Sequence, residues 1–191
     1  MNEFNWQNES ELEMLTETSL KMRALPQTDF FVNPETSQVT NSAAFYFKEI
    51  TGDFVLQAKV TPEFQGIYDA GCLFFMKDDT HWGKLCFENT DIGTQSVVSV
   101  VTNGTSDDAN GVDILGGTIH LQMIRKGDLF GFHYSHNGQD YLMNRYFKLA
   151  CGPTLKVGLV AQSPLGKGTS ILFEEISLRE LTAQNVRLGE V

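Results

Sequence analysis

Residues 68–88 read YDAGCLFFMKDDTHWGKLCFE. Two strand-like runs flank a short polar turn in this stretch, and the second run carries an aromatic ring and several charges. Successive side chains of a β-strand point to opposite faces. One face of the second run then carries Trp82, Lys84, Cys86 and Glu88, and the other carries Gly83, Leu85 and Phe87. We expect one face to pack a core while the other meets a ligand.

Similar short runs recur along nearly the whole chain. About eleven strands are expected, at residues 19–24, 44–50, 54–60, 71–76, 82–88, 96–102, 118–125, 129–135, 141–147, 155–162 and 170–178. Turn-forming groups separate them, including Lys126-Gly127-Asp128 and His136-Asn137-Gly138, where Gly and Asn tolerate positive φ and predict tight hairpins. Residues 125–147 should form a three-stranded meander. No convincing 3.6-residue apolar period extends beyond about ten residues, so helix content should be low.

The strand pattern predicts an all-β fold. Strands of this number must each bury one face, and two packed antiparallel sheets do so without long exposed edges. We therefore expect a two-sheet antiparallel β-sandwich of jelly-roll type, with residues 1–191 as a single domain and its core within about 26–181. Residues 26–41 are interpreted as a long ordered connection anchored by Phe30 and Phe31. Two arrangements stay open for the first 25 residues, which either add a strand to a sheet or pack as a separate flap.

Composition narrows the partners and the compartment. The chain has 191 residues and a formal net charge of −10 at pH 7, a sign that repels nucleic-acid phosphates. Its apolar runs are shorter than the roughly 20 residues that cross a bilayer, and the first residues are acidic and polar, unlike a signal peptide. We expect a cytoplasmic protein that binds neither nucleic acid nor membrane. Whether it forms a homodimer through an open sheet edge is left open.

The three cysteines agree with a reducing compartment. Cys72, Cys86 and Cys151 are odd in number and lack CxxC spacing, so neither a full disulfide framework nor a zinc site is indicated. A catalytic thiolate at Cys86 is the less favoured reading, because small buried thiols are far commoner.

A set of short motifs occurs in a fixed order between residues 26 and 181. They are Thr28-Asp29-Phe30-Phe31, Gly52-Asp53-Phe54, Tyr68-Asp69-Ala70-Gly71, Asp78-Asp79 with Trp82 and Lys84, Ser96-Val97-Val98 leading to Thr102, Ser106-Asp107, Gly158, Ser163-Pro164 and Phe173-Glu174. The ordered set resembles the family of unassigned function related to the yeast regulator of enolase. That resemblance implies the concanavalin A-like fold of lectins and glucanases, a ligand groove on its concave face, and an association with sugar metabolism.

Two positions depart from the pattern of that family. Cys86 stands where a small residue is usual, and Asp108 stands where an aromatic residue is common. The second change would remove a stacking platform if that position lines the groove.

The favoured function is lectin-like binding of a carbohydrate or a related small polyol, with no cofactor and no metal. Sugar recognition uses an aromatic face together with fixed polar groups. The candidate ligand-binding residues are Tyr68, Asp69, Trp82, Lys84, Glu88, Ser106 and Asp107. The structural alternative is that Trp82 packs on an adjacent strand while Lys84 and Glu88 form a surface ion pair worth less than about 1 kcal/mol.

Two other functions remain as alternatives. A glycosidase needs two carboxyl groups about 5 to 9.5 Å apart. Lys84 lies four residues before Glu88, where a glucanase would place the second carboxylate, and it should lower the pKa of Glu88. Catalysis would then require Glu88 with a second carboxylate from Asp69, Asp79 or Asp107 on a neighbouring strand. A regulatory protein-interaction module is the third reading, and an exposed apolar patch would favour it.

Other polar groups are weaker candidates. His133 and His136 could bind a metal with Asp140, and the pairs Asp78-Asp79 and Asp107-Asp108 could hold calcium, although exposed turn residues are the commoner explanation. Arg125 and Arg145 could together clamp a carboxylate, but separate pairing of each with a nearby acid is favoured.

Overall fold

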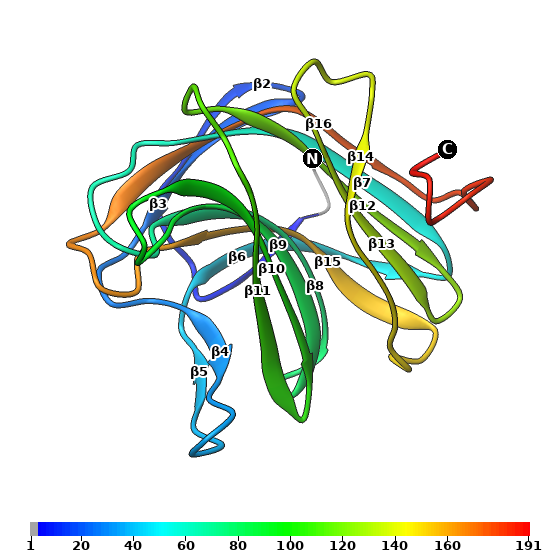
Figure 1. Cartoon of the computed structure of the whole chain (residues 1–191), viewed down its shortest axis with the longest axis horizontal. Coiled ribbons are helices and arrows are strands. Elements are labelled where there is room, and N and C mark those ends of the chain that lie inside the picture. Colours follow the sequence, from blue (N-terminus) through cyan, green and yellow to red (C-terminus); the bar gives the residue numbers. More distant parts are fainter. Residues whose placement is uncertain (1–3) are drawn as a thin grey trace.

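The chain folds into two large antiparallel sheets packed face to face (Figure 1). A computed structural model describes residues 4–191, so residues 1–3 of the expected domain lie outside the described part. No helix within 4–191 is long and apolar enough to cross a membrane. The expected all-β sandwich is confirmed, because strands of both sheets bury alternate residues between them.

Sheet A has seven strands. Their order is β1 (Asn5–Gln7), β6 (Ala44–Thr51), β15 (Thr154–Gln162), β8 (Ala70–Asp78), β9 (His81–Asn89), β10 (Gln95–Asn103) and β11 (Thr105–Asp113). In the β8–β9 hairpin, Cys72 lies opposite Cys86 and Phe74 opposite Lys84. The stretch from 68 to 88 therefore forms the centre of this sheet.

Sheet B also has seven strands. Their order is β14 (Leu142–Lys148), β13 (Leu129–Ser135), β12 (Ile119–Lys126), β7 (Phe54–Pro62), β16 (Thr169–Arg179), β3 (Ser19–Ala24) and β2 (Leu12–Thr16). Strands β12, β13 and β14 form the expected antiparallel meander. The β12–β13 turn is tight and contains Gly127 at φ 59°, whereas residues 136–141 form a longer loop before β14.

The N-terminal residues and the segment after Pro26 contain more strands than expected. Strand β1 extends sheet A, while β2 and β3 extend sheet B, so the described part of the N-terminal segment, from residue 5 to residue 24, adds strands to the sandwich and is not a separate flap. The core starts earlier than residue 26, because Leu20 and Met22 of β3 are fully buried. Residues 26–41 include the small hairpin of β4 (Phe30–Val32) and β5 (Val39–Asn41). Its strands have three residues each, too short to show a period.

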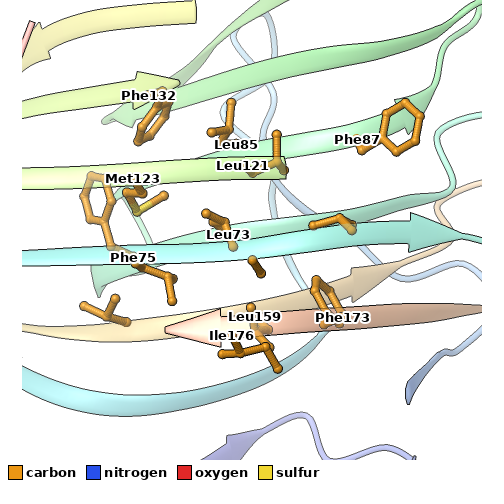
Figure 2. Close-up of a cluster of buried hydrophobic side chains, with 14 of the residues drawn as sticks. Leu73, Phe75, Leu85, Phe87, Leu121, Met123, Phe132, Leu159, Phe173 and Ile176 are labelled. Atoms are coloured by element: carbon orange, nitrogen blue, oxygen red, sulfur yellow. The ribbon is translucent and has the colours of Figure 1, made fainter. Parts of the chain in front are cut away.

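The main core lies between the two sheets (Figure 2). From sheet A it takes the odd-numbered side chains of the central hairpin, including Phe75 and Leu85. The rings of Phe75 and Phe130 stack across the sandwich with centroids 4.2 Å apart. Gly83 permits this approach, since a Cβ atom there would lie 2.6 Å from the Phe75 ring. The expectation that one face of β9 packs a core is confirmed.

A second apolar cluster covers the opposite face of sheet A, which we call the outer face. It contains Phe30, Val32, Ala43, Phe45, Phe47, Ala70, Cys72, Phe74, Met76, Trp82, Cys86, Val98, Val100 and Val160. Phe30 of β4 packs on the sheet, with its ring centroid 4.7 Å from that of Phe74. Burying a side chain of this size stabilises the fold by about 1.5–3 kcal/mol. The β4–β5 hairpin is thus a lid over part of the face that we expected to meet a ligand.

Candidate functional site

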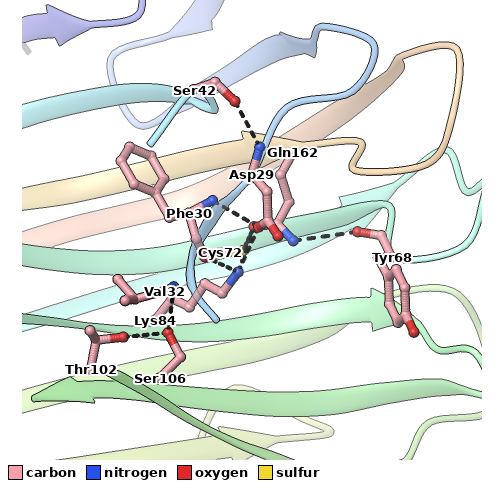
Figure 3. A network of polar contacts seen from close by, with 10 residues as sticks. All are labelled: Asp29, Phe30, Val32, Ser42, Tyr68, Cys72, Lys84, Thr102, Ser106 and Gln162. Carbon is pink, nitrogen blue, oxygen red and sulfur yellow. Dashed lines mark hydrogen bonds and ion pairs between the residues drawn. The ribbon is translucent and has the colours of Figure 1, made fainter. Parts of the chain in front are cut away.

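Lys84 lies at the junction between β9 and the segment that covers it (Figure 3). Strand alternation directs its side chain to the outer face, beneath β4. Its ammonium group donates to Asp29 Oδ1 at 2.9 Å, to the Phe30 carbonyl at 2.9 Å and to Gln162 Oε1 at 3.0 Å. These acceptors come from the start of β4 and the end of β15, so one side chain connects three segments.

The hydrogen bonds keep this buried lysine charged. Burial alone would lower the pKa of Lys84, but the Asp29 carboxylate raises it, and the net pKa is above the ordinary value. An ammonium group has three donors, and all three are occupied by protein acceptors. Lys84 therefore positions Asp29 and Gln162. The structural alternative of a surface ion pair between Lys84 and Glu88 is not what the structure shows, because Lys84 forms a buried pair with Asp29.

A cavity of about 210 Å³ opens beside this network. Its walls come from β4, β9, β10, β11, the end of β15 and the loop before β8. The lining residues are Asp29, Phe31, Tyr68, Lys84, Glu88, Val100, Asp108 and Gln162. The cavity thus combines an aromatic ring, a phenol and three carboxyl groups on the outer face of sheet A.

Glu88 is the most perturbed carboxyl group in the cavity. Its side chain is only 6% exposed, and no hydrogen bond from residues 4–191 reaches its carboxyl oxygens. Burial raises the pKa of Glu88 to about 8, and the negative charge of Asp108 adds to the shift. Lys84 does lower this pKa, as expected, but its effect is smaller than that of desolvation. The expectation of a low pKa for Glu88 was wrong, because it omitted burial.

Asp108 and Tyr68 complete the open polar groups. Desolvation raises the pKa of Asp108, although its strand β11 is largely exposed. Desolvation also raises the pKa of the Tyr68 hydroxyl, with a further contribution from the Asp91 carboxylate. Tyr68 has φ of 66°, an uncommon backbone conformation for a residue with a side chain. Tyr68 lies just before β8, so its side chain lines the cavity and is not part of the sheet.

Four of the sequence-predicted ligand residues lie away from the cavity lining. Trp82 is 1% exposed within the second cluster, where its Nε1 donates to the Asp79 carbonyl at 3.1 Å. This matches the structural alternative for Trp82, packing on an adjacent strand. Asp69 is fully buried and accepts hydrogen bonds from the amides of residues 65 and 66 and from Ser163 Oγ.

The other two are Ser106 and Asp107. The Ser106 hydroxyl accepts from the Val32 amide at 2.9 Å and so fixes β4 to β11. Asp107 is exposed and pairs with Arg145 at 2.8 Å. Of the predicted set, the structure brings Tyr68, Lys84 and Glu88 together in one cavity, while the remaining four stabilise the walls or the surface.

Sequence reasoning missed five lining residues as ligand candidates. Asp29 and Phe31 belong to the first quoted motif, so motif membership was a signal for these two, and Gln162 immediately precedes the motif Ser163-Pro164. Asp108 was named as a departure from the family pattern and as part of a possible calcium pair, and it lines the cavity. Val100 carried no signal, since an apolar residue in a strand is ordinary.

The structure also shows which groups surround the weaker candidate residues. His133 is fully buried, and its Nε2 lies 3.2 Å from the Arg187 carbonyl. Within residues 4–191, no group of three or more His, Cys, Asp or Glu side chains could hold a metal ion. The Arg125 guanidinium donates to backbone carbonyls, including that of Pro153, while Arg145 pairs with Asp107. Burial raises the pKa of the Cys86 thiol, which opposes a catalytic thiolate.

Comparisons with known proteins agree with the fold. A functionally unknown protein from Saccharomyces cerevisiae superposes with a TM-score of 0.87 at 22% identity, covering 95% of this chain and 98% of that one. Carbohydrate binding module CBM66 from Bacillus subtilis gives 0.61 at 14% identity, covering 92% and 95% of the two chains. The exoplasmic/lumenal domain of VIP36, in its Ca²⁺/Man3GlcNAc-bound form, gives 0.57 at 9% identity, covering 96% and 86%.

Sequence comparison places the chain in a family without assigned activity. A search of curated proteins found no match. A family described as protein of unknown function (DUF1349) matches residues 6–181, which include every strand from β2 to β16. The expected resemblance to a family of unassigned function with a lectin-like sandwich is thereby confirmed. The chain belongs to the DUF1349 family.

Proposed function

We propose that the protein binds a carbohydrate or a related small polyol in the cavity beside Lys84. The observation that carries this proposal is the convergence of Phe31, Tyr68, Glu88 and Asp108 around one open space on the outer face of sheet A. Sugar sites combine an aromatic surface with fixed hydrogen-bonding groups. A volume of about 210 Å³ is below the roughly 300–1,000 Å³ of sites for drug-sized ligands and suits a single sugar unit.

The polar groups have complementary roles toward hydroxyls. The carboxylates of Asp29 and Asp108 accept hydrogen bonds, whereas Glu88, with its pKa of about 8, is protonated at neutral pH and can donate one. The Lys84 network holds Asp29 in place before a ligand arrives, which reduces the entropy that binding must overcome. The likeness of the fold to a carbohydrate binding module supports the proposal.

We further propose that the protein acts in the cytoplasm, in association with sugar metabolism. All three cysteines are buried free thiols, as is common in reducing compartments.

Ligand-induced thermal stabilisation tests the binding proposal. The melting temperature is measured with neutral monosaccharides and polyols, since a ligand at 100 times its Kd stabilises the folded state by about 2.7 kcal/mol. We expect at least one of them to raise it. Asp108→Asn should weaken this effect because the substitution removes a carboxylate of the cavity. Asp107→Asn is the matched control, since the adjacent side chain pairs with Arg145. Absence of stabilisation by every sugar and polyol would contradict the proposal.

One observation favours glycoside hydrolysis as a second candidate. A pKa of about 8 keeps Glu88 protonated at neutral pH, as a general acid requires, and Asp29 or Asp108 could supply the second carboxyl group. Asp69 and Asp107 are less suited to that role, because protein groups already bind both. Hydrolysis predicts turnover of aryl glycosides that Glu88→Gln abolishes while sugar binding persists. Turnover that survives this substitution would exclude Glu88 as the acid.

A further inference from the structure

We propose that the cavity beside Lys84 selects a sugar-sized ligand bearing a protonated amine, such as an amino sugar, over neutral and acidic sugars of the same size. This inference rests on the proposed carbohydrate function and specifies the ligand class of the same cavity. Three observations carry it: the acidic character of the lining residues, the occupation of all three donors of Lys84, the single lysine among them, and a carboxyl group of the cavity without a hydrogen-bond partner.

The ionisable groups that line the cavity are mostly acidic. Asp29, Glu88 and Asp108 contribute three carboxyl groups, and Lys84 is the single basic group among the lining residues. The whole protein has the same sign, with a formal net charge of −10. In a partly desolvated site such charges act more strongly on a ligand than they would in water.

The positive charge of Lys84 is not open to a ligand. Its three donors are directed to Asp29, the Phe30 carbonyl and Gln162 at 2.9–3.0 Å. The nearest other cation acting on Asp108 is Arg145, whose Nη2 donates to Asp107 and whose Nη1 donates to backbone carbonyls. A ligand carboxylate would therefore meet carboxyl groups without a free basic donor to pair with.

Glu88 supplies the second, independent indication of a ligand. It is 94% buried and lines the cavity, and no donor from residues 4–191 hydrogen-bonds to it. The enclosed side-chain atoms without a partner in residues 4–191 are His133 Nδ1 and Asn144 Oδ1, so the Glu88 oxygens are open to the cavity, where a ligand can supply the donor. The groups that act on it electrostatically include Lys84, Asp108, Asp29 and Asp91. An ammonium ligand brings three donors and the charge that this acidic surrounding lacks.

Binding of a cation should also displace a proton. With a pKa of about 8, Glu88 is mostly protonated at pH 6.5, and a nearby ammonium group favours its ionised form. An organic amine fits better than a metal ion, because no described group of three or more His, Cys, Asp or Glu side chains is placed to coordinate one.

Calorimetric titration at pH 6.5 tests the selectivity. The matched sugars are glucosamine, N-acetylglucosamine, glucose and glucuronate. The first three differ in the substituent at C2, which is charged only in glucosamine, and glucuronate carries a carboxylate at C6. We expect glucosamine to bind at least tenfold more tightly than glucose and N-acetylglucosamine, and glucuronate to bind most weakly. Titrations in buffers of different ionisation enthalpy should reveal proton release with glucosamine. Ethanolamine tests whether the amine suffices without the ring, and Ca²⁺ tests a metal occupant.

Variants separate the charge effect from general damage. Glu88→Gln should abolish the proton release that accompanies glucosamine binding, and both it and Asp108→Asn should reduce the preference for glucosamine over glucose severalfold. Asp107→Asn should keep the preference, because its carboxylate lies outside the cavity lining. Thermal melting confirms that each variant is folded.

The outcomes distinguish this inference from the proposed function. Equal or tighter binding of glucose or N-acetylglucosamine would overturn amine selectivity and leave carbohydrate binding in place. Equally tight binding of ethanolamine, or binding of Ca²⁺ without any sugar, would overturn the assignment of an amino sugar. Failure of all four sugars to bind would overturn amine selectivity, and the absence of stabilisation by every sugar and polyol of the wider panel would overturn the proposed function as well.

Discussion

Lys84 shows how one residue determines the architecture around the cavity. Its ammonium group is buried and satisfied by three acceptors, one of them the carboxylate of Asp29. A buried ion pair offers little net stability over an apolar pair, but removal of one partner leaves an uncompensated buried charge. The value of Lys84 therefore lies in fixing where β4 meets sheet A.

Substitution of Lys84 should be costly. We expect Lys84→Met to lower the free energy of unfolding by about 3–5 kcal/mol, because Asp29 and Gln162 lose their common donor. Lys21→Met is the control, since Lys21 forms an exposed pair with Glu63 that is worth at most about 1 kcal/mol. Urea denaturation measures both changes. Similar losses for the two variants would contradict a special role for the buried pair.

The raised pKa of Glu88 predicts a pH dependence of stability. Between the ordinary carboxyl pKa near 4.5 and the folded value of about 8, the unfolded chain has lost a proton that the folded protein retains. The folded state then binds more protons, so stability should fall with rising pH by up to about 1.4 kcal/mol per unit. Below pH 4.5 and above pH 8 this contribution should be constant.

Glu88→Gln removes this group while keeping its shape. Relative to the unmodified protein, the variant should become progressively more stable as the pH rises from 5 to 8. Urea denaturation at several pH values measures the difference. A difference that stays constant over this range would mean that Glu88 titrates at an ordinary pKa.

At the scale of elements, the β4–β5 hairpin converts an open sheet face into a bounded cavity. Alternation along β4 directs Phe30 into the second cluster and Phe31 to the cavity. Ser106 of β11 binds the Val32 amide, and Lys84 of β9 binds the Phe30 carbonyl. The hairpin thus depends on sheet A for its position, and the cavity depends on the hairpin.

The two phenylalanines of β4 should respond differently to truncation. Phe30→Ala is expected to cost about 3–5 kcal/mol of stability, because its ring is fully buried between Phe45, Phe74 and Trp82. Phe31→Ala should cost less than half as much, since this side chain is half-buried, but it should weaken ligand binding. Denaturation and calorimetry measure the two effects. The reverse order would place the wrong face of β4 toward the cavity.

At the scale of the whole molecule, the C-terminal residues after β16 return to cover sheet B. Ala183 and Val186 pack with Val55 and Ile124 in a third apolar cluster. Gln122 Nε2 donates to the Gly189 carbonyl at 3.1 Å, which holds the end of the chain on the sheet. The family match ends at residue 181, so this cover lies beyond the matched region.

Deletion of residues 182–191 tests that cover. We expect a loss of about 2–4 kcal/mol, the magnitude of one buried Val-sized side chain and one or two hydrogen bonds. Ligand binding should persist, because the deleted residues pack on sheet B while the cavity lies on sheet A. Urea denaturation and the sugar titration check the two statements. Unchanged stability would show that the tail does not contribute to the fold.

The sequence by itself determined the layers of this protein. The period-two alternation of side chains between two faces in runs such as 82–88 and 129–135 identified strands, although the structure buries most residues on both faces of these two. Strand β11 gave no such signal, since its residues 107–111 include no large apolar side chain and are exposed. The same period correctly placed Lys84 and Glu88 on one face of β9. The local pattern was sufficient to assign side chains to a face where packing against one neighbouring sheet alone determined which of them are buried.

Only the tertiary structure decided which groups of that face are open to a ligand. The segment before β6 folds back over sheet A. Trp82 is therefore buried in the second cluster, Lys84 hydrogen-bonds to that segment, and Glu88 remains at the cavity wall. This depends on contacts such as Lys84 to Asp29, which join residues 55 positions apart. The high pKa of Glu88 has the same origin, because desolvation depends on everything packed around the carboxyl group and not on its neighbours along the strand.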